Sequence, residues 1–90
     1  MDVEKARNIM RTLHYRYGIE SSEISITDPF VYHVLNMHTC VVVMFYQTTI
    51  EVRVFAGMRP AMRWVDAPHD TDDAVMLIHD CIAIVVGERY

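Results

Sequence analysis

Two consecutive stretches of strand-forming residues constrain the fold more than any other feature of the sequence. The first is the unbroken apolar run Cys40-Val41-Val42-Val43-Met44-Phe45-Tyr46, which is typical of a strand covered on both faces. In the second, residues 50–55, apolar residues alternate with Glu51 and Arg53, which indicates one buried and one solvated face. The polar segment 47–49 separates the two stretches, so they predict an antiparallel hairpin over about 40–56.

The segments at the two ends of the chain predict helices. Residues 2–17 begin with a good N-cap, Asp2, carry apolar residues at helical spacing, and are followed by Gly18 at the position where a C′ glycine belongs. Residues 70–86 have acidic residues in their first turn and apolar residues around about half of the helix. The end of this second segment, 81–86, also has the composition of a strand, so the helix can alternatively stop near residue 80.

The remaining segments contain shorter strand patterns and one ambiguous stretch. Ile24 and Ile26 alternate with a serine and predict a short edge strand, and residues 62–65 predict another after a break at 56–60 that contains Gly and Pro. Residues 28–38 fit either a strand or a short helix, and the Asp-Pro start with apolar residues at helical spacing favours the helix. The expected fold is a single α+β domain over 1–90, with an antiparallel sheet of three to four strands and helices 2–17 and 70–86 packed on it.

Composition limits the size and setting of this domain. Ninety residues suit one domain, and 52% hydrophobic with 22% charged residues is a globular composition. No apolar run approaches the roughly 20 residues that cross a bilayer, and the first residues do not resemble a signal peptide. The two cysteines, Cys40 and Cys81, are expected to be reduced and buried as small hydrophobic side chains. We therefore expect a cytoplasmic protein with no membrane partner.

Charge is unevenly distributed along the chain. The formal net charge is -4, yet half of the eight basic residues lie in the first helix, and the segment 66–80 contains five aspartates and no Lys or Arg. This polarity can either steer partner proteins electrostatically or favour contacts between opposite ends of two molecules, that is, head-to-tail association. The acidic balance argues against direct nucleic-acid binding, which depends on Lys and Arg at phosphates.

The chemical motifs in the sequence are weak. The triplets His38-Thr39-Cys40 and His79-Asp80-Cys81 contain zinc-ligand types, but their spacing is not that of a closed zinc site. The dipeptides His69-Asp70 and His79-Asp80 occur in metal-dependent hydrolases and also arise by chance. No nucleophile elbow, phosphate-binding loop or dinucleotide fingerprint is found. We predict no catalytic residue, no metal site and no cofactor, and hence a protein that is not an enzyme.

Three sets of residues are candidates for contacts with other proteins. Arg, Met and Trp are enriched at interfaces, and the segment after the hairpin supplies a first candidate partner-binding set: Arg59, Met62, Arg63 and Trp64. A second candidate patch is the row beside the apolar stripe of the first helix: Arg7, Arg11 and His14. A dimer interface is expected where the last helix has apolar residues outside its main buried arc: Met76, Ala83 and Ile84.

These observations favour a non-enzymatic protein-binding module. The predicted form is a homodimer that acts as an accessory or inhibitor protein by occupying a larger protein partner, as short motif-free chains encoded by viruses or mobile elements often do. The alternative is a small-ligand or nucleotide-binding protein, with or without catalytic activity, that has its pocket at a dimer seam.

Overall fold

A computed structural model of the protein describes residues 1–35 and 37–87. Two helices bracket five strands in the chain, and the strands form one antiparallel sheet in sequential order, β1-β2-β3-β4-β5. The elements are α1 (Val3–Tyr17), β1 (Ser21–Ser25), β2 (Phe30–Val34), β3 (Cys40–Phe45), β4 (Ile50–Ala56), β5 (Arg59–Asp66) and α2 (Thr71–Gly87). The predicted α+β class is confirmed, but the sheet has five strands rather than three to four.

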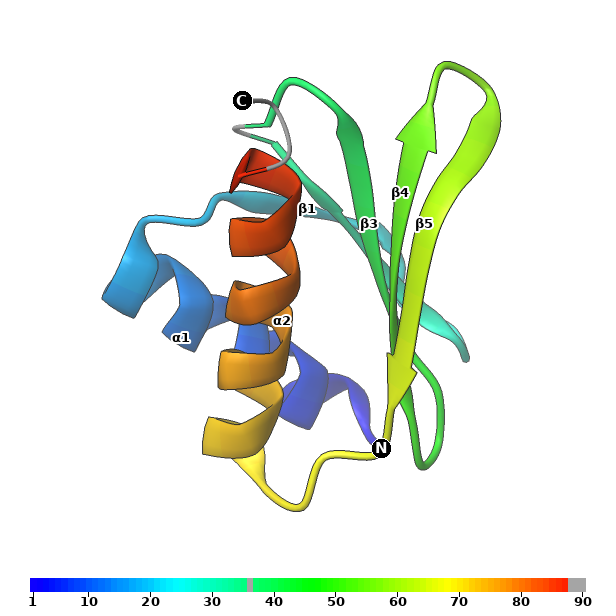
Figure 1. Ribbon diagram of the computed structural model, residues 1–90. Coiled ribbons are helices and arrows are strands. Elements are labelled where there is room, and N and C mark those ends of the chain that lie inside the picture. The colour runs from blue at the N-terminus through cyan, green and yellow to red at the C-terminus, as the bar shows by residue number, and fades with distance from the viewer. Residues whose placement is uncertain (36, 88–90) are drawn as a thin grey trace.

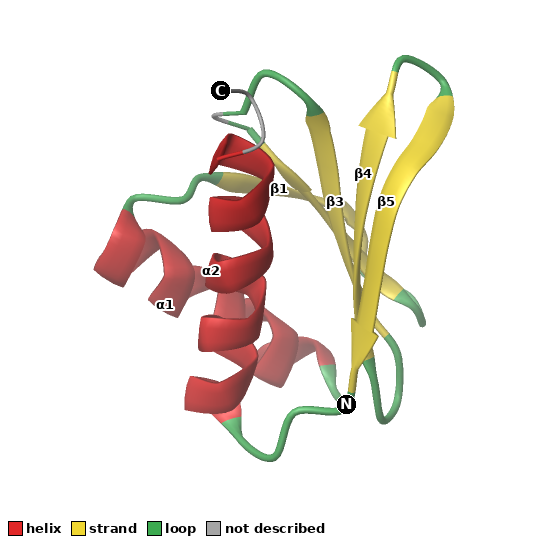
Figure 2. Cartoon of the chain, in the orientation of Figure 1, coloured by secondary structure: helices red, strands yellow, loops and turns green. Residues whose placement is uncertain are grey.

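Both helices lie on the same side of the sheet (Figures 1 and 2). They pack against its inner face, and the core contains apolar side chains from α1, α2 and the three central strands. Among residues 1–35 and 37–87, no helix lies on the opposite side, which we call the outer face. The molecule is therefore two-layered, with one solvent-facing sheet surface.

Helix α1 follows its sequence signals. The Asp2 carboxylate accepts a hydrogen bond from the Lys5 N–H at 2.8 Å, and Gly18 adopts φ +68° at the C′ position. A left-handed residue after a helix is favourable for glycine because it lacks Cβ. The buried stripe contains Ala6, Ile9, Met10 and Leu13, so the prediction of this helix is confirmed.

The prediction of a short helix within 28–38 was wrong, because residues 30–34 form strand β2. Phe30, Tyr32 and Val34 pack toward the core as alternate residues. They pair with β3, Tyr32 lying opposite Val43. Apolar residues at 30, 31, 34 and 35 satisfy helical spacing as well, so periodicity alone did not separate the two patterns, whereas the β-branched and aromatic composition did favour a strand.

Strand β5 is longer than expected. It begins at Arg59, so the predicted break over 56–60 shrinks to a turn in which Gly57 has φ +65°. Strands β3 and β4 form the predicted antiparallel hairpin, in which Val43 lies opposite Val52. At the end of the chain, α2 continues through 81–86 to Gly87, which excludes the alternative strand there.

Cys40 also departs from expectation. It is exposed, whereas Cys81 is buried on α2. Cys40 lies opposite Phe55 in the β3–β4 ladder and belongs to the outer face, over which no helix lies in residues 1–35 and 37–87. The prediction that both thiols are buried therefore holds for Cys81 alone.

Candidate functional site

The outer face of the sheet is the first candidate site, and its centre is apolar. Directly paired residues of neighbouring antiparallel strands point to the same face. One row across the outer face contains Val31, Met44, Glu51 and Val65, and the next contains His33, Val42, Arg53 and Arg63. Val31, Val42 and Met44 are half-buried, and Val65 is 48% exposed. The solvent-facing side of an antiparallel sheet usually has polar residues, so this apolar centre is unusual.

A buried carboxylate lies on the same face. Glu51 is only 2% exposed, although it points away from the core. Its two oxygens are bound by Arg53 Nε and by Arg63 Nε, the latter at 2.9 Å. Arg53 and Arg63 lie directly opposite each other, an arrangement of like charges that is unfavourable without a counter-charge. Glu51 provides it, and the three residues together retain one positive charge.

The first predicted partner-binding set does not form one surface. Met62 and Trp64 are half-buried and pack against the core from the inner face. Arg63 points to the outer face and binds Glu51. Arg59 is exposed beside the Gly57 turn, opposite Ala56. The structure therefore brings Arg63 together with the outer-face apolar residues and separates it from Met62 and Trp64.

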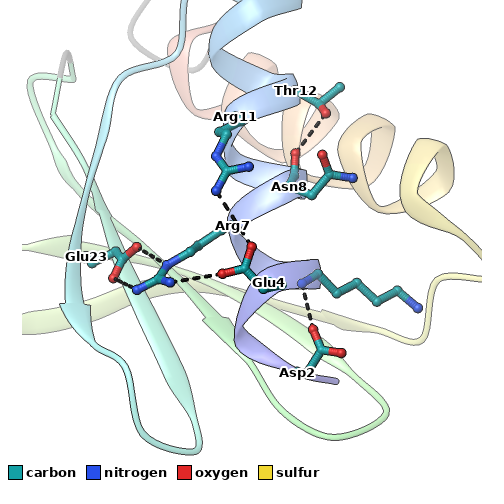
Figure 3. Close-up of polar contacts among 8 residues, drawn as sticks. Asp2, Glu4, Arg7, Asn8, Arg11, Thr12 and Glu23 are labelled. Carbon is teal, nitrogen blue, oxygen red and sulfur yellow. Dashed lines mark hydrogen bonds and ion pairs between the residues drawn. The ribbon is translucent and has the colours of Figure 1, made fainter.

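The second predicted patch lies where α1 faces strand β1. Figure 3 shows that Arg7 reaches across to Glu23, which it binds through Nε at 2.7 Å and through Nη2 at 3.2 Å. Arg7 also binds Glu4 at 3.1 Å, and Arg11 lies 3.9 Å from the same carboxylate. The hydrogen bonds that Arg7 donates to Glu23 raise the pKa of Arg7 and lower the pKa of Glu23. Burial, and then the negative charge of Glu23, raise the pKa of Tyr32 beside them.

A groove of about 790 Å³ runs along this contact between α1 and the first two strands. Its volume is within the range of about 300–1,000 Å³ typical of ligand sites. Its described lining includes two arginines and two glutamates together with His14, Tyr15 and Leu35. Because these charges balance, the groove lacks the excess of positive charge that would attract an anion. The network fixes α1 to β1, which is a structural role for Arg7.

The predicted dimer residues are accessible on α2. Met76 and Ile84 are 43% and 46% exposed, and Ala83 is exposed as well. A smaller groove of about 420 Å³ lies beside them between the end of α1 and α2. At this groove the Tyr17 ring stacks on His79 with centroids 4.0 Å apart, and the Tyr17 hydroxyl donates to Met76 Sδ at 3.3 Å.

The weak chemical motifs do not converge on a reactive centre. Among the described residues, no three His, Cys, Asp or Glu side chains are arranged to hold a metal ion. Burial, followed by the charges of Asp80 and Asp66, raises the pKa of Cys81 to about 11. A thiol with a raised pKa is a poor nucleophile at neutral pH. Neither of the helices described is long and apolar enough to cross a membrane.

Sequence reasoning missed the outer face as a site. Glu51 and Arg53 indicated a solvated face, and nothing in their spacing revealed that Arg63 joins them. One signal was present in the sequence. The unbroken apolar run 40–46 indicated a strand covered on both faces, whereas the described helices cover β3 on its inner face alone. A comparison with known protein families, with curated proteins and with solved structures gave no match.

Proposed function

We propose that the protein is a non-enzymatic protein-binding module, and that its contact surface is the outer face of the sheet. One observation carries this proposal: β3 is apolar on both sides, but within residues 1–35 and 37–87 only its inner side is covered. Contiguous apolar surface of this kind marks interaction sites on soluble domains. Beside this apolar surface, Arg53 and Arg63 hold the Glu51 carboxylate, and we call these three residues the clamp on Glu51. Its charged groups provide the orientation and specificity that apolar contact lacks.

The occupant that we propose for this face is a second copy of the same chain. Five strands at about 4.8 Å spacing and six residues at about 3.3 Å rise give a flat area of roughly 24 by 20 Å. Side chains make the accessible area larger than this projection, so the face approaches the roughly 800 Å² per partner of a stable interface. An assembly of at least two copies would act as the accessory or inhibitor of a larger protein. The two cysteines, which form no disulfide, suit a cytoplasmic setting.

The test is light scattering over a concentration series, with variants that place a carboxylate on one surface at a time. We expect a mass above 10.5 kDa for the wild type and the monomer mass for Val42→Glu. The carboxylate introduced by this substitution would lie between His33 and Arg53 in the ladder, so the sheet tolerates it while the apolar contact does not. Ile26→Glu is the matched control, because Ile26 is 62% exposed in a loop and its replacement should leave the mass unchanged. A wild-type monomer at all micromolar concentrations would refute self-association.

The exposed thiol provides a second measurement that needs no variant. Cys40 is on the outer face, so its alkylation rate should fall as protein concentration rises. Cys81 should react slowly at every concentration, because it is buried and its pKa is about 11. A Cys40 rate that is independent of concentration would place the contact elsewhere.

A small-ligand function is the second candidate, and the groove between α1 and β1 is the observation that favours it. It has the volume of a ligand site and contains an exposed aromatic residue, Tyr15. A thermal-shift screen with nucleotides, small carboxylates and metal ions tests this alternative. Stabilisation by any of them that Tyr15→Ala abolishes would favour the ligand function over the protein-binding one.

A further inference from the structure

The outer face and helix α2 carry complementary charges, and this indicates how two copies meet. Resting on the proposed function, we propose that copies of this chain associate head to tail, with the outer side of α2 in one copy seated on the outer face of the next. The proposal fixes both partners of the contact, so each can be tested separately.

The outer side of α2 combines acidic and apolar residues in one stripe. At 100° per residue, five side chains, apart from the terminal Gly87, fall within about 100° of the helix circumference: Asp73, Met76, Asp80, Ala83 and Ile84. We call them the α2 stripe, and all five are exposed. Asp73 accepts a backbone N–H bond from His69 at 3.0 Å, which leaves its charge in place. The helix contains no Lys or Arg, so the stripe has a charge of -2 beside an apolar end.

The outer face has the opposite charge. Among the strand residues whose register places them on this face, Glu51 is the one carboxylate, and it already binds Arg53 and Arg63. The Arg63 side chain is 61% exposed, and it retains donors for a carboxylate of another molecule. The face therefore presents a net charge of +1 next to Val42, Met44 and Val65.

Symmetric pairing would oppose these charges rather than match them. Two outer faces in contact would bring four arginines together with two carboxylates, and two α2 stripes would bring four aspartates together. Juxtaposed like charges in an interface disfavour association. The contact between a stripe and an outer face is the combination that places the acidic stripe beside the net positive charge of the outer face while burying Met76 and Ile84 on valines.

The dimensions of the two surfaces are compatible. Helix α2 has 17 residues, which at 1.5 Å rise gives a length of about 25 Å. The five-stranded sheet is about 24 Å wide, so the stripe fits within the outer face. One helix covers less than the whole face, which places this contact in the small, weak class of interfaces. We therefore expect association in the micromolar range.

A contact between two different surfaces leaves one of each free at the ends of the assembly. It closes into a ring if the rotation between copies permits and otherwise extends as a chain. The average mass should then rise beyond two copies as concentration increases, or reach the fixed mass of a ring.

Two variants that each block one surface test the proposal. Val42→Glu blocks the outer face and leaves the stripe intact, whereas Ile84→Glu blocks the stripe and leaves the outer face intact. We expect each variant alone to be monomeric by light scattering, and the equimolar mixture to form a closed pair of about twice 10.5 kDa. The pair forms because the intact stripe of one variant docks on the intact face of the other. Ile26→Glu is the matched control and should associate like the wild type.

Other outcomes identify the alternatives. If Val42→Glu is monomeric while Ile84→Glu associates like the wild type, two outer faces pair symmetrically; the head-to-tail contact is then refuted and the proposed function stands. If Ile84→Glu alone is monomeric, the helices pair with each other as the sequence suggested. Circular dichroism melting of each variant verifies the fold, and Val42→Thr replaces Val42→Glu if the latter does not fold.

A milder pair of variants tests the charge pairing itself. Asp80→Asn removes one charge from the stripe, and Asp28→Asn removes one from an exposed loop position outside both surfaces. We expect the dissociation constant to rise about fivefold for the first, or roughly 1 kcal/mol, and less than about twofold for the second. Equal effects would show that only net charge matters, which would contradict the specific contact.

Discussion

The inner and outer faces of the sheet are made of the same strands but differ in what covers them. The inner face contributes residues such as Val43, Phe45 and Ile50, all fully buried beneath the two helices. The outer face has half-buried valines around a carboxylate held by two arginines. On the inner face stability comes from tight apolar packing, whereas on the outer face it comes from local pairing that leaves apolar surface available. This difference assigns folding to the inner face, and it is the reason for proposing the outer face as the contact surface.

The largest expected effect is the loss of stability when a cavity is made in the core, and it distinguishes the inner face from the outer face. Among the residues that the structure describes, Phe45 has the largest fully buried side chain, and its ring packs edge-on against Tyr32 with the ring centroids 5.6 Å apart. Phe45→Ala should lower the free energy of unfolding by about 3–5 kcal/mol, measured by urea denaturation. Val65→Ala removes an apolar side chain from the outer face and should cost less than about 1 kcal/mol. Similar losses for the two variants would mean that the outer face is packed as firmly as the core.

The second effect tests the carboxylate clamp of the outer face. Glu51→Ala leaves Arg53 and Arg63 facing each other without a counter-charge, and we expect a loss of about 2 kcal/mol in the free energy of unfolding. This lies below the value for a fully buried ion pair because Arg63 is largely exposed.

Glu4→Ala is the matched control for this clamp. Glu4 also contacts two arginines, Arg7 and Arg11, but its side chain is 68% exposed. Exposed ion pairs contribute less than about 1 kcal/mol, so the two variants differ mainly in burial. If Glu51→Ala and Glu4→Ala lower the free energy of unfolding equally, the clamp on Glu51 is an ordinary surface ion pair.

The sequence predicted the parts of the fold that depend on local signals. Asp2 and Gly18 marked the ends of α1, and the alternation in residues 50–55 identified β4 and its inner face. The failures involve contacts between distant segments. Residues 28–38 matched both helical and strand spacing, and residues 30–34 form a strand because they pair with β1 on one side and β3 on the other. Met62 and Arg63 are neighbours in sequence, but the pleat of β5 sends them to opposite faces, so the first predicted set could not form one surface.

The candidate site was less predictable for the same reason. Glu51 and Arg63 are twelve residues apart and meet because β4 and β5 pair in one register. No local pattern encodes that register, which depends on the turn at Gly57 and a bulge between Val54 and Phe55. By contrast, helical periodicity alone placed Met76, Ala83 and Ile84 outside the main apolar arc of α2, and all three are exposed, whereas their role as a dimer interface stays a prediction.

The smallest effect concerns Glu23, the carboxylate at the inner-face edge, which contrasts with Glu51 by being tied to a helix rather than to strands. Hydrogen bonds from Arg7 lower the pKa of Glu23 below its ordinary value of 4.5, against the opposing effect of burial. A lowered pKa means that the folded state favours the ionised form. The stabilisation is therefore complete above pH 4.5 and is lost as pH falls through the lowered pKa.

In a carboxyl-detected NMR titration, the Glu23 midpoint should lie below 4.5 in the wild type and return toward it in Arg7→Ala. Arg16→Ala is the control, because Arg16 binds Asp72 instead and should leave the Glu23 midpoint unchanged. A wild-type midpoint at or above 4.5 would show that Arg7 and Glu23 are not bound in solution, and that this ion pair does not hold α1 to β1.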